Sequence, residues 1–324
     1  MTSYRPARRA FVFTALGALS APWCAAAADA WTDKPVRIVV PFSAGGATDA
    51  IARRFAERLR ETAGMRVVVE NITGGGSIVG AQSVARSAPD GTSLLLTGNG
   101  TLAVQKHVNP SLPLDPERDL KPVTAINTLP HWIVVRSDRP EKNFDQFVET
   151  IRRQPGKVSI SVNAVAGTTH LALASWAKAN RLDFTIVPYR GSSAAMVDLL
   201  GGATTAHVDV VGSSLQFVKA GKAKALTLLQ HERVAELPDV PAESRGLVVD
   251  SWHVLAAPAA TPDATVERIY RAAARIAAEP EFQQYIRSLG FQVWTPKPAE
   301  TQEIITRDSR KYRQMVTETG IRAN

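Results

Sequence analysis

The sequence has little of the residue types that serve as nucleophiles, metal ligands or cross-links. Of its 324 residues one is cysteine, Cys24, and it falls in an N-terminal segment that we expect to be removed. The remaining chain therefore has no thiol nucleophile, no disulfide and no zinc–thiolate site. The six histidines include no pair four residues apart and no spacing typical of a metal site; they stand at positions 107, 131, 170, 207, 231 and 253.

Two loop motifs of common enzyme classes are also absent. No Gly-Lys-Ser/Thr sequence follows a glycine-rich loop, which excludes a P-loop nucleotide site. No Gly-x-Ser-x-Gly sequence occurs, so the usual nucleophile turn of a hydrolase is missing. We therefore predict no catalytic residue, no metal and no cofactor.

A dinucleotide-binding loop is present only in part. The glycines of Gly74-x-Gly76-x-x-x-Gly80 follow an expected strand, as in some secreted oxidoreductases. That fold needs an acidic residue at the end of the next strand, but the strand here ends in Leu96-Thr97-Gly98-Asn99. A secreted nucleotide-dependent oxidoreductase stays an alternative that this strand end disfavours.

The excess of positive charge is small and scattered. The formal net charge is +8, and removing residues 1–30, with three arginines and one aspartate, lowers it to +6. A nucleic-acid binder would concentrate basic residues in runs or interleave them with aromatic residues, and no such pattern occurs. We expect no nucleic-acid partner, and the surplus is compatible with anionic solutes.

The N-terminus has the three-part layout of an export signal. Arginines among residues 1–9 precede the apolar stretch Ala10–Ser20, and Ala28-Asp29-Ala30 offers a cleavage site. The apolar stretch is too short to span a membrane. We predict that residues 1–30 are a signal peptide and that the mature chain lies in the periplasm. Arg8–Val12 loosely resembles a twin-arginine signal, so the Sec and Tat routes both stay open.

A strand-to-helix corner follows directly. The apolar run Ile38–Val40 stops at Pro41, two glycines permit a tight turn, and Ala50–Arg60 has apolar residues on one helical face. Such a corner directs backbone N–H groups and the positive end of a helix at one point, which suits a carboxylate or phosphate. On geometry alone, an ordinary connection between strand and helix is an equally open interpretation.

Strands and helices alternate through the rest of the chain, which favours an α/β fold with mostly parallel sheets. A proline-punctuated connection is expected at Pro110–Pro122 and a return crossing at Ser251–Pro258. The expected strands are residues 66–70, 93–96, 132–135, 158–162, 184–187, 206–211 and 223–229, and the expected helices include 144–153, 262–278, 280–289 and 298–317.

Several motifs in order resemble one family. They include Pro41-Phe42-x-x-Gly45-Gly46-x-x-Asp49, Gly74-Gly75-Gly76-Ser77, Gly167-Thr168-Thr169-His170, Val187-Pro188-Tyr189-Arg190-Gly191 and Asp198-Leu199-Leu200-Gly201-Gly202. The series is similar to the Bug-type receptors, the periplasmic solute-binding subunits of tripartite tricarboxylate transporters. The resemblance covers essentially the whole mature chain.

The resemblance implies a two-domain Venus-flytrap fold of the type II periplasmic binding class. Domain 1 would comprise residues 31–131 plus 251–324, and domain 2 residues 132–250, joined by two crossings. Such receptors are not enzymes. They bind small carboxylates or related amides as monomers and deliver them to the membrane permease subunits, or in some systems act with a sensor kinase.

The resemblance also implies the binding residues. The corner after the first strand would hold one carboxylate, with a second helix start in the same domain and a third in the other. The residues expected at the ligand are Phe42, Ser43, Ala44, Gly45, Gly46, Thr48, Asp49, Gly75, Gly76, Ser77, Asn99, Asn163, Gly167, Thr168, Thr169 and Asp209. For Asp49, a hydrogen bond to its own loop is as well supported as a ligand contact.

The ligand class stays open between two alternatives. A dicarboxylate or an acidic amino acid is the first, and a pyridine carboxylate or nicotinamide-like ligand is the second, because Phe42 and Trp132 would stack on a flat ring. His131 and Val208 are unusual for the family and are expected near the edge of the cleft.

Overall fold

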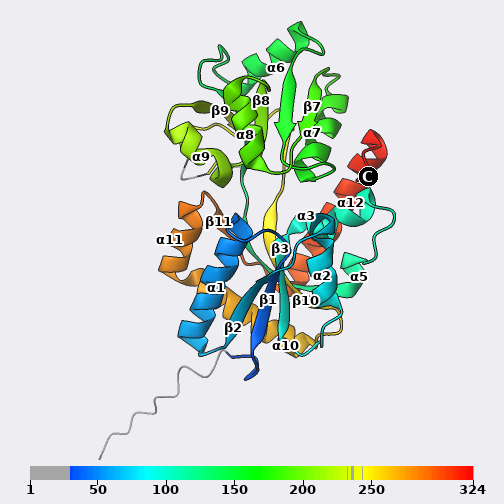
Figure 1. Ribbon diagram of the computed structural model, residues 1–324, viewed down its shortest axis with the longest axis vertical. Coiled ribbons are helices and arrows are strands. Elements are labelled where there is room, and N and C mark those ends of the chain that lie inside the picture. Colours follow the sequence, from blue (N-terminus) through cyan, green and yellow to red (C-terminus); the bar gives the residue numbers. More distant parts are fainter. Residues whose placement is uncertain (1–29, 232, 235–236, 243, 324) are drawn as a thin grey trace, which may run out of the picture.

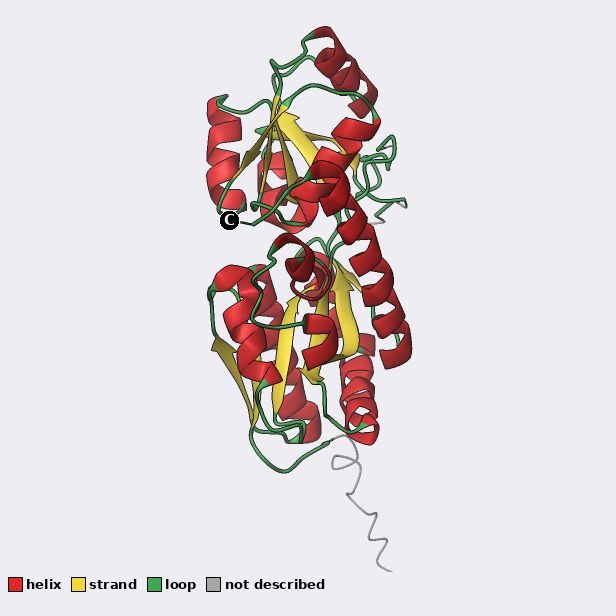
Figure 2. Ribbon diagram, turned by 90° about the vertical axis from the view of Figure 1, so that its right-hand side faces the viewer, coloured by secondary structure: helices red, strands yellow, loops and turns green. Residues whose placement is uncertain are grey.

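The computed structural model describes residues 30–231, 233–234, 237–242 and 244–323. The predicted signal peptide lies almost entirely outside the described residues. The described chain forms two separate sheets, one above the other, with helices packed around each (Figures 1 and 2). No helix in these residues is long and apolar enough to cross a membrane.

The first sheet has the strand order β11-β4-β10-β3-β1-β2. Its strands are β1 (Val36–Val40), β2 (Val67–Asn71), β3 (Ser93–Gly98), β4 (Leu120–Thr128), β10 (Trp252–Pro258) and β11 (Gln292–Val293). Its helices are α1 (Ala47–Ala63), α2 (Ile78–Ala85), α10 (Asp263–Ala278), α11 (Pro280–Ser288) and α12 (Pro298–Thr319), with the short helices η1 (Gly75–Ser77), α3 (Asn99–Ala103), α4 (Gln105–Val108) and α5 (Pro116–Asp119).

The second sheet has the order β7-β6-β8-β5-β9. Its strands are β5 (His131–Arg136), β6 (Ser159–Val162), β7 (Thr185–Pro188), β8 (Ala206–Val210) and β9 (Ala223–Leu228). Its helices are α6 (Phe144–Arg153), α7 (Thr168–Ala179), α8 (Ser192–Gly201) and α9 (Val211–Lys219).

The two-domain α/β fold agrees with the prediction, but the strand pairing is mixed instead of mostly parallel. Among the described strands, four pairs are parallel and five are antiparallel. The antiparallel pairs all involve β4, β5 or β10, the strands next to the passages between the sheets. A chain that leaves one sheet and returns to it reverses direction there, so the crossover rule for parallel units does not apply to these strands.

The chain passes between the sheets at two adjacent places. The first passage is Leu129–Pro130, and the second is the segment between β9 and β10; the Leu129 N–H donates to the Ser251 carbonyl at 2.8 Å. The expectation that residues up to Pro122 only connect elements is wrong, because β4 begins at Leu120. His131, predicted to close domain 1, opens β5 of the second sheet. The exact domain boundaries stay a prediction.

Helix α12 bridges the two domains. It starts on the first sheet and its last turns lie beside α7, close to the C-terminus (Figure 1). The Lys178 ammonium donates to the Glu318 carbonyl at 2.6 Å, and Tyr312 and Val316 pack with Leu171 of α7. The segment 251–324, predicted to belong to domain 1, thus ends on domain 2.

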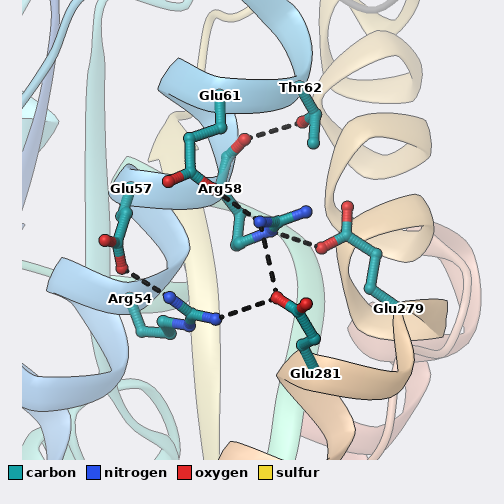
Figure 3. Close-up of polar contacts among 7 residues, drawn as sticks. All are labelled: Arg54, Glu57, Arg58, Glu61, Thr62, Glu279 and Glu281. Atoms are coloured by element: carbon teal, nitrogen blue, oxygen red, sulfur yellow. Dashed lines mark hydrogen bonds and ion pairs between the residues drawn. The ribbon is translucent and has the colours of Figure 1, made fainter.

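Helix α1 is held on the first sheet by an apolar face and an ion-pair cluster. Ile51, Phe55 and Leu59, four residues apart, are buried as their spacing predicts. On the other side, Arg58 donates to Glu279 at 2.6 Å, which ties α1 to the start of α11. Arg58 also donates to Glu61 of α1 itself at 2.5 Å (Figure 3). This fixed position places the N-terminus of α1 firmly at the end of β1.

Candidate functional site

A cavity of about 440 Å³ lies between the two sheets. It is located where the strand-to-helix connections of both sheets meet, the usual place for ligands in α/β folds. Nine of the residues predicted at the ligand line it, from both domains: Phe42, Thr48, Gly76, Ser77, Asn99, Asn163, Gly167, Thr168 and Thr169. Their contact with a ligand stays a prediction.

The other predicted residues lie outside the cavity lining. Ser43, Ala44, Gly45 and Gly46 form the exposed loop between β1 and α1, and Gly75 is exposed as well. The remaining two, the carboxylates Asp49 and Asp209, are buried behind the cavity wall.

Asp49 holds its own loop together. Its carboxylate accepts hydrogen bonds from the Gly45 N–H at 2.9 Å, from Arg53 at 2.9 Å and from Asn71 at 3.0 Å. Burial raises the pKa of this carboxyl, but the hydrogen bonds from Arg53, Gly45 and Asn71 together bring it below its usual value. Of the two interpretations left open for Asp49, the contacts favour the loop-holding one.

Three helix starts converge on the cavity. Residues at the N-termini of α1, α3 and α7 line it, and the Ser77 and Thr101 hydroxyls are hydrogen-bonded at 2.7 Å in its first-domain wall. The first N–H groups of a helix have no partner within that helix. The cavity is therefore lined by uncharged polar groups and by positive helix ends.

Within the described part of the chain, no Lys, Arg, Asp or Glu lines the cavity. Among the described residues, no group of three or more His, Cys, Asp or Glu side chains is arranged to hold a metal ion. An anion in this cavity would be bound without a buried cationic side chain. The protein thereby avoids the desolvation of such a side chain, which costs on the order of several kcal/mol per ion.

His253, on β10, was missed by the sequence predictions. Its Nδ1 donates to Asn127 Oδ1 at 3.0 Å, since the Asn127 amide nitrogen donates to the Thr128 carbonyl. Its Nε2 therefore accepts from the Thr48 hydroxyl at 2.9 Å. Burial lowers the pKa of His253 from 6.5 to about 4, so the ring is neutral at pH 7. Thr48 consequently offers lone pairs, not its proton, to the cavity.

His131 also lines the cavity, which agrees with its expected place at the cleft edge. Trp132 and Val208 do not line the cavity. Trp132 is fully buried in the domain-2 core, where its Nε1 donates to Ser214 at 2.8 Å, and Val208 is buried in another cluster. The prediction that Trp132 stacks on a flat ligand is wrong, because β5 is covered on both faces and this side chain points into a helix-packed layer.

Two α/β domains joined by adjacent passages, with a cavity between them lined from both, define a two-domain solute-binding protein. Residues 51–321 match the family described as "Tripartite tricarboxylate transporter family receptor". The chain belongs to this family of periplasmic solute-binding proteins.

Similar proteins and similar solved structures align with nearly the whole chain. The "UPF0065 protein in tcbD-tcbE intergenic region" of Pseudomonas sp. (strain P51) is 33% identical over 322 residues, covering 98% of this chain and 96% of the relative. The periplasmic binding protein BugD has a TM-score of 0.76 at 30% identity, covering 90% and 99% of the two chains.

Two further similar structures were solved with a ligand. MatC from Rhodopseudomonas palustris, with bound malate, has a TM-score of 0.75 at 26% identity, covering 87% of this chain and 98% of that one. Rpa4515 from R. palustris, with adipate, has a TM-score of 0.81 at 25% identity, covering 90% and 99%.

Proposed function

We propose that this protein is a periplasmic receptor that captures a small carboxylate, a dicarboxylate or an acidic amino acid, in the cavity between its domains. It then delivers the ligand unchanged to the membrane permease subunits of a tripartite tricarboxylate transporter. The observation that carries this proposal is a cavity ringed by helix N-termini and hydroxyls and free of charged side chains. Malate and adipate, bound by two similar proteins, are ligands of this class.

The proposed partners follow from the same assignment. The protein acts as a monomer exported by its signal peptide, binds no nucleic acid and needs no cofactor. A neighbouring pair of genes for a large and a small membrane subunit supports transport, whereas a nearby sensor kinase without such a pair supports a role in sensing.

A pyridine carboxylate or nicotinamide-like ligand is the second candidate. Phe42 and Phe291 line the cavity and provide apolar surface for a ring. Trp132 is buried away from the cavity and cannot stack on the ring, so this candidate has less support than an aliphatic carboxylate.

A thermal-shift screen of the mature protein, purified after export, tests the proposal. A carboxylate present at about 100 times its dissociation constant adds about 2.7 kcal/mol to the free energy of unfolding. The same incubation, followed by mass spectrometry, should return the carboxylate unchanged. Stabilisation by sugars or cations alone would refute the assignment, and measurable turnover would refute the receptor role.

Replacing Thr168 by valine should weaken carboxylate binding about tenfold, because one hydroxyl at the start of α7 is lost while the side-chain shape is kept. Thr168 lines the cavity, and its Oγ1 lies 3.4 Å from the Ser251 hydroxyl of the other domain. Thr317→Val, at an exposed threonine of α12, is the matched control. Equal affinities of the Thr168 variant and the control would place the site elsewhere.

A further inference from the structure

One corner of the cavity is rich in hydrogen-bond acceptors. It lies at the carboxyl end of β8, where Val210 lines the cavity. His131 pairs with Val210 on one side of this strand end, and Asn163 follows β6 on the other, since Val162 pairs with Val208. Both residues line the cavity, so they face it from either side of the same strand.

The tautomer of His131 follows from its one hydrogen bond. Its Nδ1 lies 2.8 Å from the Leu129 carbonyl, which only accepts, so Nδ1 carries the proton. In the neutral ring Nε2 is then an acceptor, and no other described residue donates a hydrogen bond to it. The side chain is 3% exposed, and His131 is one of the residues that line the cavity. Burial lowers the pKa of His131 to about 4, which keeps the ring neutral.

Asn163 is oriented as an acceptor too. Its amide nitrogen donates to Asp209 Oδ1 at 2.9 Å, and a carboxylate only accepts, so the amide cannot be reversed. The opposite atom, Asn163 Oδ1, is covered and has no hydrogen-bond partner within the described chain. The corner therefore contains two acceptors and no donor for either.

The corner has no free negative charge. Asp209 is fully buried and accepts from Asn163, from the Ser192 hydroxyl at 2.6 Å and from the Val210 N–H at 2.8 Å. Asp209 itself does not line the cavity, and neither does any other carboxylate of the described residues. A ligand ammonium would be buried here without a carboxylate in contact with it, whereas a hydroxyl or an amide N–H matches neutral acceptors without that cost.

We propose that His131 determines specificity: its Nε2 accepts a hydrogen bond from the ligand, which is a carboxylate carrying a neutral donor, a hydroxyl or an amide N–H. This inference rests on the proposed function and narrows it. The helix starts bind the carboxylate groups of the ligand, and the acceptors of His131 and Asn163 at the end of β8 bind its neutral donor. An unsubstituted carboxylate leaves a buried acceptor unpaired, so it binds more weakly.

Three diacids that differ at one atom test this inference. Succinate, malate and aspartate carry hydrogen, hydroxyl and ammonium at the same carbon, and isothermal titration calorimetry of the mature protein at pH 7 compares them. Five- and six-carbon sets are used if the four-carbon acids are too short. The hydroxy acid should bind at least about tenfold more tightly than both others, the discrimination expected for one buried hydrogen bond.

His131→Phe should reduce the preference for the hydroxy acid over the unsubstituted acid to within about threefold. His231→Phe, at an exposed histidine, keeps the full preference. Nitrogen NMR of the histidine rings in the unmodified protein gives a readout that needs no variant. The Nε2 resonance of His131 should shift with the hydroxy acid and stay in place with the unsubstituted acid.

Equal binding of hydroxy and unsubstituted acids, tighter binding of the amino acid, or a preference that survives His131→Phe would each overturn the inference while leaving the proposed function intact. Failure of every diacid to bind would instead refute the proposed function, and this inference with it.

Discussion

Replacing Gly212 by alanine should weaken ligand binding by about 10- to 100-fold, the equivalent of about 1–3 kcal/mol of steric overpacking. Gly212 begins α9 in domain 2, and a Cβ there would lie 2.1 Å from the Leu289 carbonyl oxygen of domain 1 and 3.0 Å from the Phe291 ring. A backbone oxygen cannot move aside as a side chain can. The domains must separate at this edge, so the arrangement that encloses the ligand becomes less stable.

The control is Gly201→Ala, in α8. A Cβ at Gly201 meets no atom within 4 Å, so the same change of residue should leave affinity unaltered. Calorimetry gives the affinities, and small-angle X-ray scattering follows the compaction that ligand produces. If Gly212→Ala binds as tightly as Gly201→Ala, close approach of the domains at this edge contributes nothing to binding.

Acidification from pH 7 to pH 5 should lower the free energy of unfolding by at least about 4 kcal/mol. His131 and His253 each contribute about 2 kcal/mol, and burial also lowers the pKa of His107, His170 and His207. The pKa values of His131 and His253 are lowered by burial from 6.5 to about 4 in the folded protein. Between these values the unfolded chain binds more protons than the folded one. The stabilisation is therefore complete above pH 6.5 and is lost as the pH falls towards 4.

Urea unfolding at pH 7 and pH 5 measures this difference. His131→Phe removes one of the two rings whose pKa is lowered to about 4 and should reduce the decrease by about 2 kcal/mol. Equal free energies of unfolding at the two pH values would show that the buried histidines take up protons as readily in the folded protein as in the unfolded chain.

Elements set by local sequence were predictable. Helix α6 agrees residue for residue with the predicted range 144–153, since its apolar spacing and the Asn143 cap are local signals. β10 and β4 were not predicted. In the sequence Pro122 indicates the end of a strand. In the structure it pairs with Ala256 at an irregularity in the register of β4 and β10, where a proline is tolerated. Only pairing with strands far along the chain makes these segments strands.

The same distinction separates the site residues. Gly76 and Thr168 were predictable because a glycine-rich turn before a helix is visible in the sequence. His253 reaches the cavity because β10 lies between β3 and β4, which no local pattern reveals. In β5 every residue from His131 to Val135 is buried, so alternation could not show that Trp132 faces the core.

A crystal structure of the mature protein with its tightest-binding diacid tests the central claim most directly. The account predicts the ligand in the cavity between the domains, with carboxylate oxygens within about 3.2 Å of N–H groups at the start of α1 and of N–H or hydroxyl groups at the start of α7. His131 Nε2 would accept from the ligand's neutral donor. A diacid bound outside this cavity, or bound through Arg or Lys side chains, would contradict the account.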